Sequence, residues 1–170
     1  MARPKHTFYW DASIFIAWLT DEQRADRTEM DAIAEVIQRN QRGEVLIVAG
    51  PVMDQELVFS TMTIEAKERF HNALRTRRVQ KLPYDPRADA IATEIREYYA
   101  ALGEKLVETA DSLHLGYAIH YQVDQFHTFD DGGRKGRSLL ALDGNVAGYR
   151  LKICKPPLTQ LVLPLSGAQP

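Results

Sequence analysis

The chain has almost none of the residues from which disulfide frameworks and thiolate metal clusters are built. Its single cysteine, Cys154, lies in an apolar stretch near the end of the chain, which is typical of a small buried hydrophobic residue. One cysteine excludes an internal disulfide and a metal site made of several thiolates. This composition favours a cytoplasmic location.

Long hydrophobic runs are also missing. No segment approaches the roughly 20 apolar residues that a transmembrane helix needs, so we expect no association with a membrane. An apolar run does follow Arg3 and Lys5, but Asp11 interrupts it and no small-residue cleavage site follows. We therefore interpret this run as the first strand of the mature fold and not as a signal peptide.

The chain also lacks a strong excess of positive or negative charge. The net charge is −2, so any binding to nucleic acid depends on local basic patches and not on overall charge. Internal repeats and low-complexity tracts are absent too. With 45% hydrophobic and 26% charged residues, the chain reads as one globular domain, over residues 1–170, with a substantial core.

What the chain does contain is an alternation of strand and helix patterns. Apolar or β-branched runs predict strands over 7–10, 45–49, 79–82, 125–129 and 151–154. Helical patterns lie between them, over 12–19, from about Met30 to Gly43, from Pro51 past Leu57, and over 64–74, 86–102, 111–121 and 138–142. This order predicts an α/β fold, a three-layer α/β/α sandwich with a central parallel β-sheet.

Four carboxylates occupy comparable places in this pattern. Asp11 follows the first strand, Glu56 lies in the helix after the second, Asp111 opens an apolar helix, and Asp130 follows the next strand. In a parallel sheet such positions can converge at the pole where ligands bind. Clustered carboxylates repel one another unless a cation is present, and hard cations prefer oxygen ligands. The pattern therefore predicts a site for Mg²⁺ or Mn²⁺.

Each carboxylate also has a purely structural explanation. Asp11 and Asp111 are good helix N-caps, Glu56 suits the first turn of a helix, and Asp130 suits an Asx-turn. Four such residues at strand and helix ends are better explained together than as separate accidents. His114, three residues after Asp111, is interpreted as a hydrogen-bonded core histidine and not as a metal ligand.

The residues around these carboxylates resemble PIN-domain nucleases, and most closely VapC-type ribonuclease toxins. The resemblance runs from about Phe8 to Pro156 and rests on Asp11-Ala12-Ser13, on Glu56, on the stretch from Ala110 to Leu115, and on Thr128-Phe129-Asp130. It implies hydrolysis of RNA with Mg²⁺ or Mn²⁺. By position, Asp11, Glu56, Asp111 and Asp130 are then the catalytic, metal-binding residues.

The resemblance also assigns supporting roles. It implies that Ser13 and Thr128 support the carboxylates by hydrogen bonding, while the doublet Asp130-Asp131 leaves Asp131 open as the fourth ligand. It further implies a small antitoxin protein as partner and a homodimer. The nearby residues Arg134, Lys135 and Arg137 suit contact with a nucleic-acid backbone, although a solvated loop explains them equally well.

The hypothesis from the sequence is a divalent-metal-dependent endoribonuclease acting on single-stranded RNA. Divalent ions lower the pKa of water and stabilise charge in an in-line phosphoryl displacement, so no side-chain nucleophile is required. The alternative is a PIN-fold module that binds nucleic acid or a partner with weak or no catalysis. A P-loop is excluded because the loop after Gly132 lacks the Gly-Lys-Ser/Thr ending, and a haloacid-dehalogenase-type phosphatase would need an aspartate where Ser13 stands.

Overall fold

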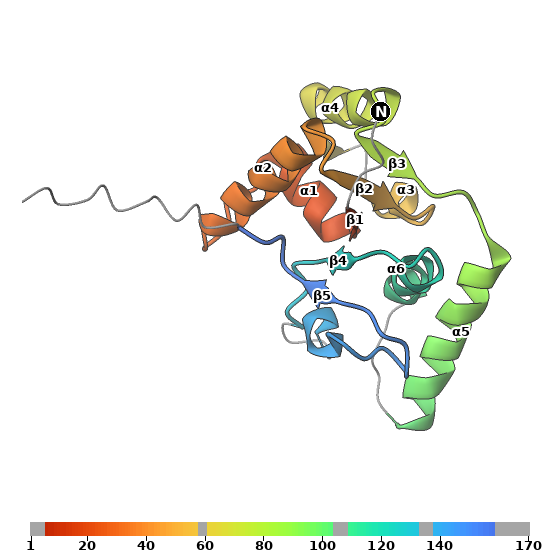
Figure 1. The fold of residues 1–170 in the computed structure, drawn as a ribbon. Coiled ribbons are helices and arrows are strands. Elements are labelled where there is room, and N and C mark those ends of the chain that lie inside the picture. The colour runs from red at the N-terminus through yellow and green to blue at the C-terminus, as the bar shows by residue number, and fades with distance from the viewer. Residues whose placement is uncertain (1–5, 58–60, 104–108, 133–137, 159–170) are drawn as a thin grey trace, which may run out of the picture.

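The central strand of the sheet is β1 (His6–Trp10), which pairs in parallel with a strand on each side. In the computed structural model, which describes residues 6–57, 61–103, 109–132 and 138–158, the strand order is β3-β2-β1-β4-β5 (Figure 1). All the pairings between these strands are parallel, which confirms the predicted α/β fold. The other strands are β2 (Val45–Ala49), β3 (Val79–Lys81), β4 (Gln125–His127) and β5 (Ile153–Cys154).

Helices cover both faces of this sheet, as Figure 1 shows. One face carries α1 (Ala12–Thr20), α2 (Thr28–Gln41) and α4 (Ile64–Arg75). The other face carries α5 (Pro86–Ala101) and α6 (Thr109–His120), which pack closely against each other. A short helix, α3 (Met53–Glu56), follows β2, and a 3₁₀ helix, η2 (Leu139–Leu142), precedes β5.

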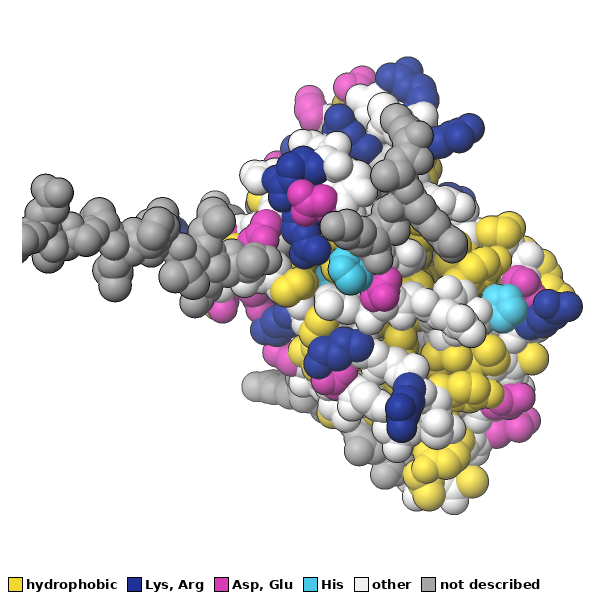
Figure 2. Space-filling model, in the orientation of Figure 1, with side chains coloured by type: hydrophobic (Ala, Val, Ile, Leu, Met, Phe, Trp, Pro, Cys, Tyr) yellow, Lys and Arg dark blue, Asp and Glu magenta, His cyan; other side chains and the backbone are white. Residues whose placement is uncertain are grey.

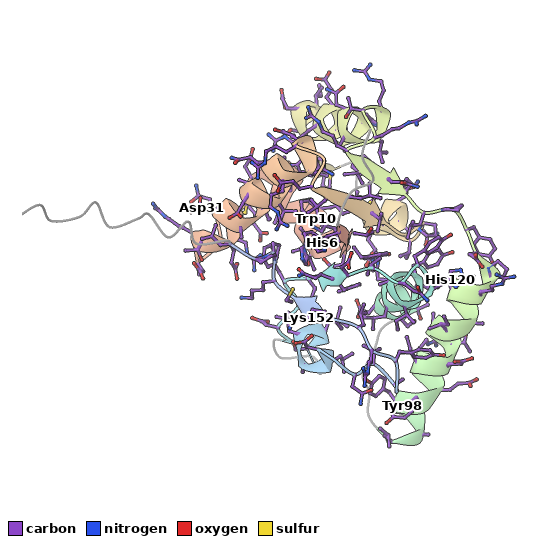
Figure 3. All side chains as sticks on the ribbon, viewed as in Figure 1. His6, Trp10, Asp31, Tyr98, His120 and Lys152 are labelled. Carbon is purple, nitrogen blue, oxygen red and sulfur yellow. The ribbon has the colours of Figure 1, made fainter. Side chains whose placement is uncertain are left out.

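The alternation of side chains along β1 builds two separate cores. Phe8 and Trp10 pack into the core under α1, α2 and α4, whereas Tyr9 packs into the core under α5 and α6. All three side chains are almost completely buried. Figure 3 shows Trp10 in the middle of the molecule and Tyr98 at its periphery. A strand buried on both faces explains why its sequence is apolar and aromatic throughout.

Several helix ends lie where the sequence places them. Asp85 caps α5 by accepting a hydrogen bond from the Arg87 backbone N–H, and Pro86 begins that helix. Gly43 and Gly103 follow helices with φ of +74° and +71°, the left-handed conformation that glycine adopts readily. No helix in the described part of the chain is long and apolar enough to cross a membrane.

Some sequence predictions about elements are wrong in detail. The helix predicted from Pro51 past Leu57 is only α3, because Leu57 is already extended. Ile64 and Leu102 belong to predicted apolar helix faces but are 70% and 56% exposed. Both lie at or next to a helix end. The predicted strand over 125–129 ends at His127, and the last strand is only β5.

Candidate active site

The candidate site lies at the carboxyl ends of β1 and β4. Trp10 and His127, the last residues of these strands, are paired in register. The Asp11 backbone N–H continues this pairing by donating to the His127 carbonyl, at 3.3 Å. The segments that leave the two strands, with Asp11 on one and Asp130 on the other, therefore start side by side at the pole where parallel sheets bind ligands.

Asp11 is held in place by hydrogen bonds to one of its oxygens. Oδ1 accepts from the Ile14 backbone N–H at 3.1 Å and from the Ser13 hydroxyl at 2.6 Å, so Asp11 does cap α1. The Ser13 hydroxyl in turn accepts from the Phe129 backbone N–H, which ties α1 to the segment after β4. Burial raises the pKa of Asp11, and hydrogen bonds from Ser13 and Thr128 lower it in part.

Asp130 connects the site to both ends of the basic segment. Its Oδ1 accepts from the Gly132 backbone N–H at 2.9 Å, which is the Asx-turn suggested by the sequence. Its Oδ2 accepts from the Leu139 backbone N–H at 3.0 Å, and the Thr128 hydroxyl accepts from the Asp130 N–H. Asp131 is exposed, whereas Asp130 is half-buried.

Glu56 is the last residue of α3, beyond the carboxyl end of β2. The sequence predicted that Glu56 lies one turn into a longer helix, and this prediction is wrong in the length of that helix. Its Oε2 is hydrogen-bonded to Nε2 of His114 on α6. His114 is 1% exposed, which agrees with its interpretation as a hydrogen-bonded core histidine.

Asp111 lies inside α6, after the helical residues Thr109 and Ala110, so it is not the N-cap of that helix. Its pKa is raised to about 6, first by burial and then by the negative charges of Asp130, Asp11 and Glu56, while His114 opposes the shift. Three of the predicted carboxylates thus act on the fourth, Asp111, through their charge. The fold brings together residues that are far apart in the sequence.

The chemistry of this group suits a hard divalent cation. The four groups supply carboxylate oxygens, and their mutual repulsion would be relieved by positive charge. Within the described residues, no three His, Cys, Asp or Glu side chains converge closely enough to hold a metal ion as they stand. In chemical kind the oxygen donors nevertheless fit Mg²⁺ or Mn²⁺, and Asp11, Glu56, Asp111 and Asp130 are the residues that would hold it.

Other predicted or polar residues are placed as follows. Arg134, Lys135 and Arg137 lie outside the described residues.

His127 is completely buried between Trp10 and Gln125, and burial lowers its pKa to about 3, so it is a neutral structural residue. Figure 3 shows His120 on the side where α6 meets α5, and its Nε2 is 3.0 Å from Oδ2 of Asp85.

Two residues of the site were missed as such from the sequence. Tyr9 has no exposed surface, and its hydroxyl is 2.8 Å from Nδ1 of His114 and 2.9 Å from the backbone nitrogen of Gly50. In the sequence Tyr9 reads only as part of an aromatic strand. For His114, the one sequence feature that pointed to the site was its spacing of three residues from Asp111, because residues at this spacing share a helix face.

The chain is similar to known proteins in sequence pattern and in fold. A family model described as "PIN domain" matches residues 8–136. No curated protein sequence matches.

Two solved structures share the fold. A chain of the VapBC2 structure from Rickettsia felis, bound to a DNA fragment from its promoter, superposes with a TM-score of 0.60 at 11% identity, over 86% of this chain and 98% of the other. A chain of the FitAcB structure from Neisseria gonorrhoeae superposes with a TM-score of 0.54 at 15% identity, over 88% and 97%.

Proposed function

Because the chain belongs to the PIN-domain family, we propose that it is a divalent-metal-dependent endoribonuclease that hydrolyses phosphodiester bonds of single-stranded RNA. Members of this family are generally nucleases. The observation that carries the proposal is the gathering of four carboxylates at one pole of the sheet, where burial first, and then the charges of Asp130, Asp11 and Glu56, raise the pKa of Asp111 to about 6. Carboxylates kept close together at a loss of stability are typical of functional sites.

In this proposal each carboxylate has a role that its surroundings support. Asp11, Glu56, Asp111 and Asp130 hold Mg²⁺ or Mn²⁺, and Ser13 and Thr128 keep Asp11 in place. When bound, the metal would stabilise the charge that develops on the phosphodiester and activate the attacking water. The protein itself contributes orientation, because hydrogen bonds fix Asp11, Glu56 and Asp130.

The RNA backbone is proposed to bind at the basic segment beside the site. Asp130 accepts hydrogen bonds from Gly132 and Leu139, so Arg134, Lys135 and Arg137 lie on a segment whose two ends are tied to a proposed metal ligand. Cations there suit phosphate contacts close to the scissile bond.

We also propose that the protein is the toxin of a toxin–antitoxin pair, forms a homodimer, and acts in the cytoplasm. The fold similarity to chains from VapBC2 and FitAcB supports an antitoxin partner. Figure 2 shows hydrophobic side chains gathered over the part of the surface where α5 and α6 lie. Tyr98 and Leu102, at the end of α5 and just beyond it, are 46% and 56% exposed, which suits contact with another protein chain.

The test is cleavage of an end-labelled single-stranded RNA in the presence of Mn²⁺ or of EDTA. We expect cleavage by the wild-type protein only with the metal, and none by Asp111→Asn. The matched control is Asp31→Asn, which removes an exposed carboxylate on α2 and should leave the rate unchanged. Binding of RNA without cleavage would contradict the proposal and support the alternative of a binding module.

A further inference from the structure

Glu56 is connected to the interior of the protein by a chain of buried hydrogen bonds. The chain runs from the Gly50 backbone N–H to the Tyr9 hydroxyl, then to Nδ1 of His114, and from Nε2 of His114 to Oε2 of Glu56. Its members come from β1, from α6, and from the segment between β2 and α3. The Tyr9 and His114 side chains are 0% and 1% exposed, so water does not compete for these bonds.

The two ends of this chain have fixed hydrogen-bonding roles. A backbone N–H can only donate, so the Tyr9 oxygen accepts from Gly50, and its own proton is available to Nδ1 of His114 at 2.8 Å. A carboxylate can only accept, so Nε2 of His114 carries the proton that Glu56 receives. Burial raises the pKa of Tyr9 well above its ordinary value, which keeps the phenol proton in place. His114 thus meets Glu56 through Nε2 and Tyr9 through Nδ1.

The chain is also closely packed at its start. A Cβ added at Gly50 would lie 2.3 Å from the Tyr9 oxygen, so only glycine lets the backbone come this close. The Tyr9 ring stacks on Phe126 with the ring planes 8° apart, which fixes the position of the Tyr9 oxygen. The Tyr9 oxygen is thus held in one position, and its hydrogen bond to Nδ1 holds the His114 ring.

We propose that Tyr9 and His114 are positioning residues that hold Glu56 by its Oε2 and leave Oε1 free for the divalent cation. This inference rests on the proposed function, because it takes Glu56 as a metal ligand. A partner behind a ligating carboxylate fixes its orientation, and loss of such a partner weakens metal binding by about 10- to 100-fold. Tyr9 and His114 contact neither RNA nor metal in this proposal.

The first experiment compares Tyr9→Phe with Tyr99→Phe. Tyr99 is a matched control because it is also buried and its hydroxyl also accepts from a backbone N–H, that of Ala147, away from the carboxylates. We expect Mn²⁺ binding, measured by calorimetry, to weaken about 10-fold or more in Tyr9→Phe and to stay unchanged in Tyr99→Phe. Melting curves without metal check that both variants are folded.

A second pair of variants separates the hydrogen bond from the bulk of the side chain. His114→Gln keeps an N–H donor near the position of Nε2, whereas His114→Leu removes it. We expect the glutamine variant to bind Mn²⁺ more tightly than the leucine variant. Nitrogen chemical shifts of the histidine rings in the metal-free protein give a readout independent of metal, and we expect His114 to be protonated at Nε2.

The outcomes separate the two proposals. Wild-type affinity for Mn²⁺ in Tyr9→Phe, or a His114 ring protonated at Nδ1, would overturn the positioning role and leave the proposed nuclease intact. A wild-type protein that binds no Mn²⁺ in calorimetry would overturn the proposed metal site and this inference with it.

Discussion

Among single residues, Asp11 combines two roles in one side chain, one structural and one electrostatic. It caps α1 through the Ile14 N–H, and its charge contributes to the carboxylate group around Asp111. The cap uses the oxygen lone pairs, which asparagine also has, whereas the metal site uses the negative charge, which asparagine lacks. The two roles can therefore be separated by substitution.

We expect Asp11→Asn to be nearly as stable as the wild type and Asp11→Ala to be less stable than Asp11→Asn by about 1 kcal/mol, because alanine cannot cap the helix. Both variants should lose Mn²⁺ binding. Urea unfolding measures the first effect and calorimetry the second. Equal stability of the alanine and asparagine variants would show that the cap contributes nothing to the fold.

Asp111 makes the stability of the metal-free protein depend on pH. Its pKa is about 6 in the folded protein and 3.8 ordinarily, so between these values the folded protein keeps a proton that the unfolded chain releases. Its contribution to stability therefore falls as the pH rises from about 4 to 6, and the loss is complete above about pH 6.

Asp111→Asn should remove this dependence. In EDTA, we expect its melting temperature relative to wild type to rise between pH 4 and 6 and then to stay level, with the variant no less stable at pH 7. RNA cleavage should be lost at the same time. A variant that melts well below wild type at pH 7 would show that Asp111 stabilises the fold and is not an unfavourable charge.

At the scale of elements, the contact between α5 and α6 sets the position of His114 and Asp111. Gly116 of α6 faces α5 so closely that an added Cβ would lie 2.5 Å from the Ala88 carbonyl oxygen and 2.9 Å from the Ala92 nitrogen. These are backbone atoms, so a larger residue can be accommodated only if the two helices move apart.

We expect Gly116→Ala to destabilise the protein by about 1–3 kcal/mol, because overpacking outweighs the gain of about 1 kcal/mol in helix propensity. Thermal unfolding in EDTA measures the change without any contribution from bound metal. An increase in melting temperature would mean that propensity dominates and that the contact between the helices is looser than the structure indicates.

The basic segment after Asp130 is the second element with a testable role. If Arg134, Lys135 and Arg137 contact RNA phosphates, replacing all three by alanine should lower the salt slope of RNA binding by about 2. The matched control replaces Arg75, Arg77 and Arg78, the basic run at the end of α4, which we expect to be solvated. Equal slopes for wild type and the loop variant would contradict the RNA contact.

At the scale of the whole molecule, metal binding should stabilise the fold, because the site joins segments that follow β1, β2 and β4 with α6. Mn²⁺ at 100 times its Kd should add about 2.7 kcal/mol. For a protein of this size we expect the melting temperature to rise by about 5–10 °C. The shift should be much smaller in Asp111→Asn, and its absence in the wild type would contradict the metal site.

The amino-acid sequence was enough to predict the type and order of most elements and to nominate four carboxylates as site candidates. Asp11, Asp85 and Gly103 lie where local rules put them, because capping and left-handed turns depend on neighbouring residues only. The parallel sheet followed from the alternation of strands and helices. The carboxyl pole of the sheet was therefore predictable as the place of the candidate site.

Only the tertiary structure decided how these residues meet. Tyr9 and Glu56 are 105 and 58 residues away from His114, and no local pattern encodes such contacts. Likewise, Ile64 and Leu102 are exposed although periodicity places them on apolar helix faces, because their burial depends on whether another element reaches the end of each helix. A sequence pattern specifies which side of an element is apolar, but the packing of distant elements fixes what that side touches.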